Sequence, residues 1–223
     1  MASRCWARTP CWSFCVRSDA EELALLGDDI AGCSACFADG GAVPVFAHRT
    51  GARVLVIGQA PSLTDSRTRS TFSGPGGRRL RAWLDEAGVP EEDVSFSALT
   101  KCYPGKSPGG KGDRAPTRVE IAACRPFLER EIRALRPRIV LLVGAMAINE
   151  LLRRAPLADL VGQAFDGSSS ILIAHASDEP GSVLVVPLPH CSGASLWLNR
   201  PEHQALLADA IHQIRNAYAS ITA

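Results

Sequence analysis

Four cysteines in this chain have the number and spacing of metal ligands. Cys33 and Cys36 form a C-x2-C pair, while Cys102 follows a predicted strand and Cys124 falls within a predicted helix. A close pair with two separated thiols suits a tetrahedral metal ion or an iron–sulfur cubane, and spacing alone does not distinguish zinc from iron. The alternative is that the thiols are buried and unligated, but this alternative explains a C-x2-C pair poorly. The other cysteines fit no ligand spacing and are expected to be free: Cys5, Cys11, Cys15 and Cys191.

A second group of residues has the pattern of a site for a flat ligand. Gly58-Gln59-Ala60-Pro61-Ser62 directly follows a predicted strand, and a glycine and a proline there make a tight turn that exposes backbone amides. Phe72 comes shortly afterwards in a Ser/Gly/Pro segment, where its ring is placed to stack on a flat ligand. The alternative is an ordinary strand-to-helix turn with Phe72 as a hydrophobic plug beneath it.

His190 ends the last predicted strand and is followed closely by Ser192 and Gly193. A lone histidine is more often structural than catalytic, but the end of a strand is where α/β sheets bind ligands, so we favour a functional role. Trp197 and Asn199 lie further along the same loop and are candidates for contact with DNA. Alternatively, they pack against and cap the helix that begins near residue 201.

The stretch 101–118 carries a concentration of positive charge. Its basic residues are Lys101, Lys106, Lys111, Arg114 and Arg118, against Asp113 as the single acid. Glycines and prolines within 104–112 exclude a regular helix or strand. Such a segment is commonly a solvated loop, but beside an active site it would contact phosphates through Lys106, Lys111 and Arg114.

Composition sets limits on the class of protein. The 223 residues allow one sizeable core, 46% hydrophobic and 21% charged residues are ordinary for a globular domain, and a net charge of +1 excludes binding through bulk charge. The longest apolar runs, 139–143 and 183–188, are too short to span a bilayer. Polar residues interrupt every apolar stretch in 1–18, so no signal-peptide core is present. We therefore expect a cytoplasmic monomer without a membrane partner.

The elements that must position these residues alternate along the chain. We expect strands at 53–57, 94–99, 138–143 and 183–188, and helices at 20–31, 77–87, 118–135, 145–153 and 202–217. Thr117 and Glu120 have the spacing of a capping box for the third of these helices. The alternation predicts an irregular arm over 1–20 and then a single α/β domain over 21–223, with a central, mainly parallel sheet flanked by helices. Ligands of such sheets bind at the carboxyl ends of the strands.

Taken in order, these motifs resemble the uracil-DNA glycosylase superfamily, in particular its families 4 and 5, over roughly residues 32–207. Besides the C-x2-C pair and the turn, the matching segments are Phe72 to Gly77, Lys101-Cys102-Tyr103-Pro104, Glu120 to Leu128, Arg136 to Ala147 and His190-Cys191-Ser192. The resemblance implies a glycosylase that flips uracil, or another damaged base, out of DNA and hydrolyses its glycosidic bond. It also implies a 4Fe–4S cluster on Cys33, Cys36, Cys102 and Cys124, with zinc as the alternative occupant.

The resemblance further implies roles for single residues. Phe72 would stack on the base, while Gly58, Gln59, Ala60 and Ser97 would contact its edge. His190 would donate a hydrogen bond to the departing base, and Ser192 would contact DNA.

The acids that activate water in relatives are replaced in this chain. Gln59 and Ala60 stand where family 4 and family 1 enzymes carry an acidic residue, Pro75 replaces the family 5 aspartate, and Ser97 replaces the family 4 asparagine. Gln59 is therefore expected to orient water, and Asp65 is the nearest candidate base. Two other classes stay open: a catalytically inactive nucleic-acid-binding protein of the same fold, and a redox or zinc-stabilised nucleotide-binding protein.

Overall fold

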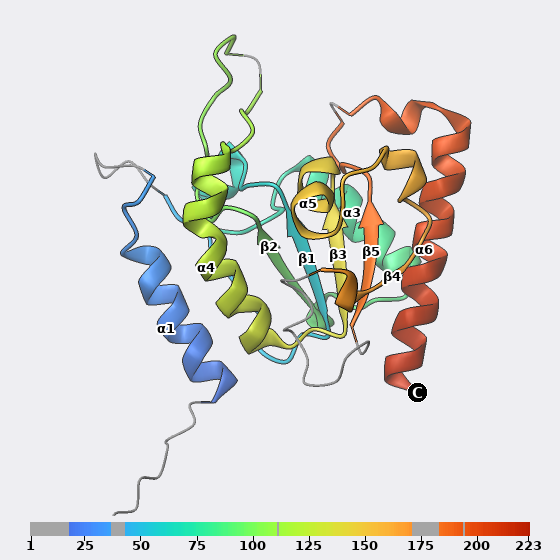
Figure 1. The fold of residues 1–223 in the computed structure, drawn as a ribbon, viewed down its shortest axis with the longest axis horizontal. Coiled ribbons are helices and arrows are strands. Elements are labelled where there is room, and N and C mark those ends of the chain that lie inside the picture. Colours follow the sequence, from blue (N-terminus) through green and yellow to red (C-terminus); the bar gives the residue numbers. More distant parts are fainter. Residues whose placement is uncertain (1–17, 37–42, 111, 171–182, 194) are drawn as a thin grey trace, which may run out of the picture.

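The computed structural model describes residues 18–36, 43–110, 112–170, 183–193 and 195–223, and it has three layers. A central sheet lies between α1, α4 and α5 on one face and α3 and α6 on the other (Figure 1). The mainly parallel α/β domain predicted from the alternating pattern is thereby confirmed. Most of the predicted arm, together with Cys5, Cys11 and Cys15, lies outside the described residues.

The predicted elements are present, with ends that differ by a few residues. The strands are β1 (Val54–Gly58), β2 (Val94–Ala98), β3 (Ile139–Val143), β4 (Phe165–Asp166) and β5 (Leu184–Leu188). The helices are α1 (Asp19–Ala31), α2 (Leu63–Thr68), α3 (Pro75–Glu86), α4 (Arg118–Leu135), α5 (Ala145–Leu151) and α6 (Pro201–Thr222). The boundaries of α4 are those predicted, because Thr117 and Glu120 do form the reciprocal capping box.

The strands are ordered β2-β1-β3-β5-β4, and all neighbours are parallel except β4 and β5. Side chains alternate between the two cores. In β1, Leu55 and Ile57 pack toward α4 and α5, while Val54 and Val56 pack toward α3 and α6. The carboxyl ends of the four parallel strands therefore meet at one edge, where the predicted site segments begin.

Two elements were not predicted. The helix α2 has six residues, too few to show an apolar period, and is fixed by a capping box between Ser62 and Asp65. The strand β4 has two residues and pairs antiparallel with the edge of β5.

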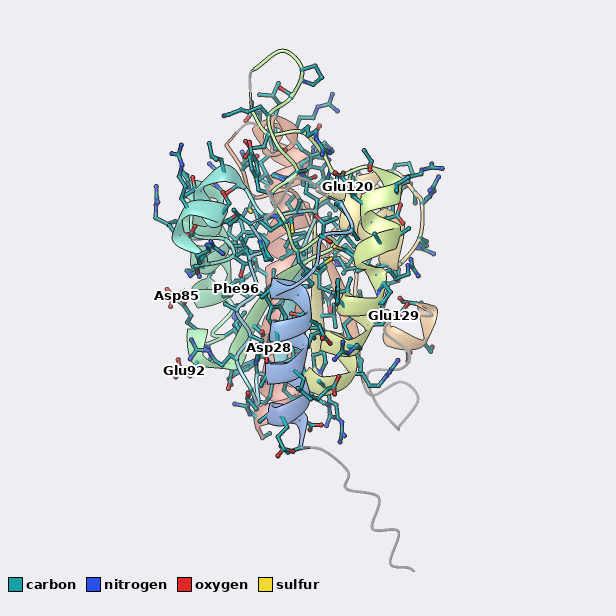
Figure 2. The ribbon with its side chains drawn as sticks, turned by 90° about the vertical axis from the view of Figure 1, so that its left-hand side faces the viewer. Asp28, Asp85, Glu92, Phe96, Glu120 and Glu129 are labelled. Atoms are coloured by element: carbon teal, nitrogen blue, oxygen red, sulfur yellow. The ribbon has the colours of Figure 1, made fainter. Side chains whose placement is uncertain are left out.

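The helix α1 is attached to the outside of α4 (Figure 2). Its buried residues Leu23, Leu26 and Ile30 join the core beneath, and Arg130 of α4 forms ion pairs with Glu22 and Asp29. None of the described helices is long and apolar enough to cross a membrane.

Candidate active-site cleft and cysteine cavity

A cleft of about 600 Å³ opens at the carboxyl edge of the sheet. The turn after β1, the loop before α3, the loop after β2 and the loop after β5 all contribute to its walls. The cleft brings together most of the predicted site residues, namely Gly58, Gln59, Ala60, Asp65, Phe72, Arg114, His190 and Ser192.

His190 is held in a defined tautomer. The backbone N–H of Ser192 donates to Nδ1 of His190 at 3.2 Å, so that nitrogen must be unprotonated. Burial lowers the pKa of His190, and the ring is therefore neutral near pH 7, with its proton on Nε2. A Cβ at Gly144, where φ is +87°, would lie 3.1 Å from Cδ2 of the ring. The glycine thus lets the end of β3 approach the histidine closely.

Phe72 lies against the floor of the cleft in an unusual backbone conformation. Its φ is +53°, in the left-handed region that bulky residues rarely occupy. A Cβ at Gly58 would lie 2.8 Å from Cζ of the ring, so the ring rests directly on the backbone of the turn after β1. The ring centroid is 5.6 Å from that of Phe96 in β2. The far end of the Phe72 ring is thus held against Gly58, with the Phe96 ring beside it.

Asp65 lines the cleft, but both of its carboxylate oxygens are occupied. Oδ2 accepts from the backbone N–H and the hydroxyl of Ser62, each at 2.8 Å. Oδ1 accepts from the backbone N–H and the hydroxyl of Ser73, each at 2.7 Å. The side chain is buried, 6% exposed, and it ties the start of α2 to the segment that follows Phe72. These contacts are those of a residue that fixes the wall of the site.

Asp113 is a cleft residue whose role the sequence did not indicate. The Tyr103 hydroxyl donates to its Oδ1 at 2.8 Å, and the backbone N–H of Leu63 donates to its Oδ2 at 3.3 Å. It thereby joins the loop after β2 to the first turn of α2. The only available signal was its position as the single acid of the basic stretch 101–118.

The structure places Ser97 away from the cleft. Its hydroxyl is buried and donates to Oε2 of Glu131 in α4 at 2.6 Å. Nζ of Lys101 donates to the Ser97 hydroxyl oxygen and to the same Oε2 of Glu131, each at 2.6 Å. Ser97 is opposite Ile57 in the parallel register, so it faces the α4 side of the sheet. The predicted contact between Ser97 and the edge of a base has no counterpart here, because the hydroxyl belongs to a buried ionic network.

The basic stretch forms a loop that projects from the sheet edge between β2 and α4 (Figure 1). Lys106 is exposed and lies opposite Asp113, with 3.9 Å between Nζ and Oδ1. The Arg114 guanidinium instead binds both oxygens of Glu120, at 2.5 and 2.8 Å, and holds the pKa of that carboxyl down to about 2. Arg114 is thus an anchor of the loop, while Lys111 lies outside the described residues.

The structure does not bring Trp197 and Asn199 into the cleft. The Trp197 ring stacks on His203 with centroids 4.0 Å apart, and its backbone carbonyl is 2.8 Å from Nδ1 of the same histidine. Asn199 is exposed directly before α6. The sequence left packing and capping as the alternative for both residues. The Trp197 contacts agree with packing, whereas the N-cap position of α6 is Arg200, without a side-chain cap.

The four predicted ligand cysteines line one small cavity, together with Thr100, Pro104 and Glu120. Glu120 is labelled near the upper end of α4 in Figure 2. Burial and then the neighbouring thiols of Cys124, Cys33 and Cys36 raise the pKa of Cys102 to about 12. Within the described ranges, no group of three His, Cys, Asp or Glu side chains is arranged to hold a single metal ion. Four thiols are a donor set for either a tetrahedral zinc ion or an iron–sulfur cubane.

A wider and more open groove of about 720 Å³ lies between the first turns of α4 and α5. Its walls contain none of the predicted site residues. The chemistry-bearing side chains are concentrated in the cleft and the cysteine cavity, and we place the candidate site there.

The fold and the cleft define an α/β protein with a ligand site at the carboxyl edge of its sheet. The model of the uracil DNA glycosylase superfamily matches residues 46–213, and the chain belongs to this superfamily. It is similar to the type-4 uracil-DNA glycosylase of Pyrobaculum aerophilum, with 34% identity over 51% of this chain and 58% of that protein. The resemblance to family 4 inferred from the motifs is confirmed.

Two further type-4 uracil-DNA glycosylases are similar over somewhat longer regions. That of Saccharolobus solfataricus is 30% identical over 60% of this chain and 61% of its own length. That of Thermotoga maritima is 28% identical over 58% of this chain and 65% of its own length. The matched regions thus span about three fifths of the curated relatives.

Proposed function

We propose that this protein is a DNA glycosylase that removes uracil from DNA by hydrolysing the N-glycosidic bond. The observation that carries the proposal is the meeting of a neutral His190 with a supported aromatic face, Phe72, in one cleft at the sheet edge. Membership of the superfamily and similarity to type-4 uracil-DNA glycosylases support the same conclusion. The similarity to these DNA glycosylases supports DNA as the substrate, and the target base would be extruded from the helix into the cleft.

The cleft could contact a flipped base in two ways, by stacking on its face and by hydrogen bonds to its edge. The Phe72 ring would stack on the base, since its far end is held against Gly58 and the Phe96 ring lies beside it. The turn formed by Gly58, Gln59 and Ala60 would contact the edge through its backbone amides. Ser192 lies at the rim and would contact the backbone of the DNA.

His190 would stabilise the charge that develops on the leaving base. As the glycosidic bond breaks, the bonding electrons move onto the base and one carbonyl oxygen becomes more negative. Nε2–H of His190 is free to donate to that oxygen, because Nδ1 already accepts from Ser192. Donors that are oriented before the reaction typically contribute about 3–4 kcal/mol. The neutral form suffices, so no proton needs to leave the ring.

Water must then attack the sugar, and the carboxylates of the cleft are poorly placed to take its proton. Asp65 and Asp113 both line the cleft. Each oxygen of Asp65 accepts two hydrogen bonds, and each oxygen of Asp113 accepts one, which holds both side chains to the wall. We assign the positioning of the water to Gln59, whose amide orients it without accepting the proton. The proton that the water loses on adding to the sugar would pass to the departed base anion, which leaves as neutral uracil. Such a site suits a transition state in which the bond to the base is largely broken before water adds.

We further propose that Cys33, Cys36, Cys102 and Cys124 hold a 4Fe–4S cluster. Four thiols lining one cavity are a ligand set for such a cluster, and the similarity to type-4 uracil-DNA glycosylases favours it over zinc, which the same thiols could also bind. When bound, the cluster would supply a cross-link between the segment after α1, the loop after β2 and α4. The reaction itself would take place in the separate cleft.

Excision of uracil tests the proposed function directly. Single- and double-stranded oligonucleotides with one uracil are incubated with the protein and then treated with alkali, which cleaves the strand wherever a base has been lost. We expect cleavage at uracil and none in the matched thymine oligonucleotide. The occupied carboxylates of the cleft favour one alternative, an inactive DNA-binding protein of the same fold, which would bind both oligonucleotides and cleave neither.

A further inference from the structure

The backbone of Phe72 is held in place by residues of α3. With φ at +53°, its backbone has a conformation that a bulky residue keeps only if its surroundings impose it. Gly77 contributes to this, because a Cβ there would lie 1.6 Å from the Phe72 carbonyl oxygen. The first turn of α3 therefore lies directly against the backbone of Phe72.

Arg81 binds this strained backbone from the following turn of α3. Its Nη1 donates to the carbonyl oxygen of Phe72 at 2.7 Å, and its Nε donates to Oε1 of Glu91 at 3.0 Å. The guanidinium carbon lies 4.6 Å from the centroid of the Phe96 ring, which is labelled in Figure 2. One planar group thus contacts both the backbone of Phe72 and the aromatic ring beside it.

We propose that Arg81 is a positioning residue that keeps the Phe72 ring in the orientation needed to stack on the flipped base. This inference rests on the proposed glycosylase function. Arg81 lines a small separate cavity on the α3 side of β2 rather than the cleft, so it acts through Phe72 and does not touch the base. Arg81 donates a hydrogen bond to the carbonyl oxygen of Phe72 and so holds the strained backbone from which the ring projects. The tilt of the ring depends on that backbone, and stacking depends on the tilt.

The test is a double-mutant cycle measured by single-turnover excision of uracil. Arg81→Met keeps an unbranched side chain but removes both the donor and the guanidinium beside Phe96, and Arg81→Lys restores one donor and the positive charge. We expect Arg81→Met to lower the rate about 10-fold to 100-fold and Arg81→Lys to recover part of the loss. In a Phe72→Ala background, Arg81→Met should cost less than about 3-fold, because the ring through which it acts is absent. Arg133→Ala, an exposed charge removal on α4, serves as the matched control.

The outcomes separate the two proposals. An inactive wild-type protein overturns the proposed function, whereas an active wild type with an unaffected Arg81→Met overturns only the positioning role. An equal loss with and without Phe72 also overturns it, because the effect would then be general. The melting temperature of each variant is measured alongside, and Arg81→Lys provides a second variant if Arg81→Met does not fold.

Discussion

At the scale of single residues, the site works by fixing side chains before any ligand arrives. His190 receives its tautomer from one backbone N–H, while Gly58 and Phe96 hold the ring of Phe72 and Gly77 holds its backbone. Groups that are already oriented lose little further freedom when the transition state forms, which is why such donors are effective.

Replacing His190 should affect the chemical step more than binding. We expect His190→Ala to lose about 100- to 1000-fold in single-turnover rate with little change in affinity for DNA, because the contact strengthens only as charge develops. His190→Asn should retain part of the rate, since an amide still donates. Near-normal turnover of His190→Ala would show that the histidine is structural.

The same residue predicts a pH dependence of the wild-type rate. Burial lowers the pKa of His190 below its ordinary value of about 6.5, so the ring gains its second proton only on the acid side of that pH. That proton would occupy Nδ1 and oppose the N–H of Ser192. The rate should be flat at neutral and alkaline pH and should fall as the pH drops through the lowered pKa. An acid limb that persists in His190→Asn would assign it to another group.

Asp65 gives a second test at this scale. An asparagine at this position would lose about half of the acceptor capacity that Ser62 and Ser73 use, and we expect the free energy of unfolding to fall by about 1.5–3 kcal/mol. Thermal melts of Asp65→Asn are compared with those of Asp85→Asn, an exposed position on α3 that points outward in Figure 2. A normal melting temperature with a large loss of rate would instead identify Asp65 as the base.

At the scale of elements, the ion pair between Lys101 and Glu131 joins the loop after β2 to the C-terminal part of α4. Both side chains are almost fully buried, with 2.6 Å between Nζ and Oε2, and Ser97 completes the network. Lys101 comes directly before Cys102 in the sequence, so the ion pair also fixes the backbone that carries this thiol.

Breaking this pair should be costly. Lys101→Met leaves the Glu131 carboxylate buried without its cation, and we expect a loss of about 3–5 kcal/mol in the free energy of unfolding. The double variant Lys101→Met/Glu131→Leu should recover much of that loss, because both charges are then removed. Urea denaturation measures both variants, and additive losses in the double variant would show that the two groups do not interact.

These elements also show what sequence patterns can and cannot predict. The long helices and buried strands were predictable because they carry periodic apolar residues and caps, as α4 does with Thr117 and Glu120. The placement of Ser97 was not, because the motif gave its position along the chain but not the face toward which a strand residue points. The hydrogen bonds to Oδ1 of Asp65 come from Ser73, eight residues away, and no local sequence pattern indicates that contact.

At the scale of the whole molecule, the cysteine cavity lies where three separate parts of the chain meet. Cys33 and Cys36 follow α1, Cys102 follows β2, and Cys124 lies in α4. A group bound there would connect α1 to the sheet edge independently of the hydrophobic contacts between α1 and α4. The loop after β2 contributes to the walls of both the cavity and the cleft, and Pro104 lines both.

The purified protein should contain about four irons per chain and absorb broadly near 400 nm, an approximate wavelength typical of such clusters. Cys124→Ala should lose the iron and become less stable, because metal binding contributes to the free energy of folding. Cys191→Ala is the matched control, since this thiol is also buried but lies outside the cysteine cavity. Bound zinc in place of iron would contradict the cluster, as would wild-type iron content in Cys124→Ala.

The two glycines that contact Phe72 impose different limits on how this sequence can diverge. At Gly58 a new methyl group would meet the end of the Phe72 side chain, so a smaller residue at position 72 can compensate for the change. At Gly77 the obstacle is the carbonyl oxygen of Phe72, which every residue at position 72 also carries. Positions 58 and 72 can therefore change together across a lineage, whereas glycine at position 77 must be retained for as long as the turn keeps its shape.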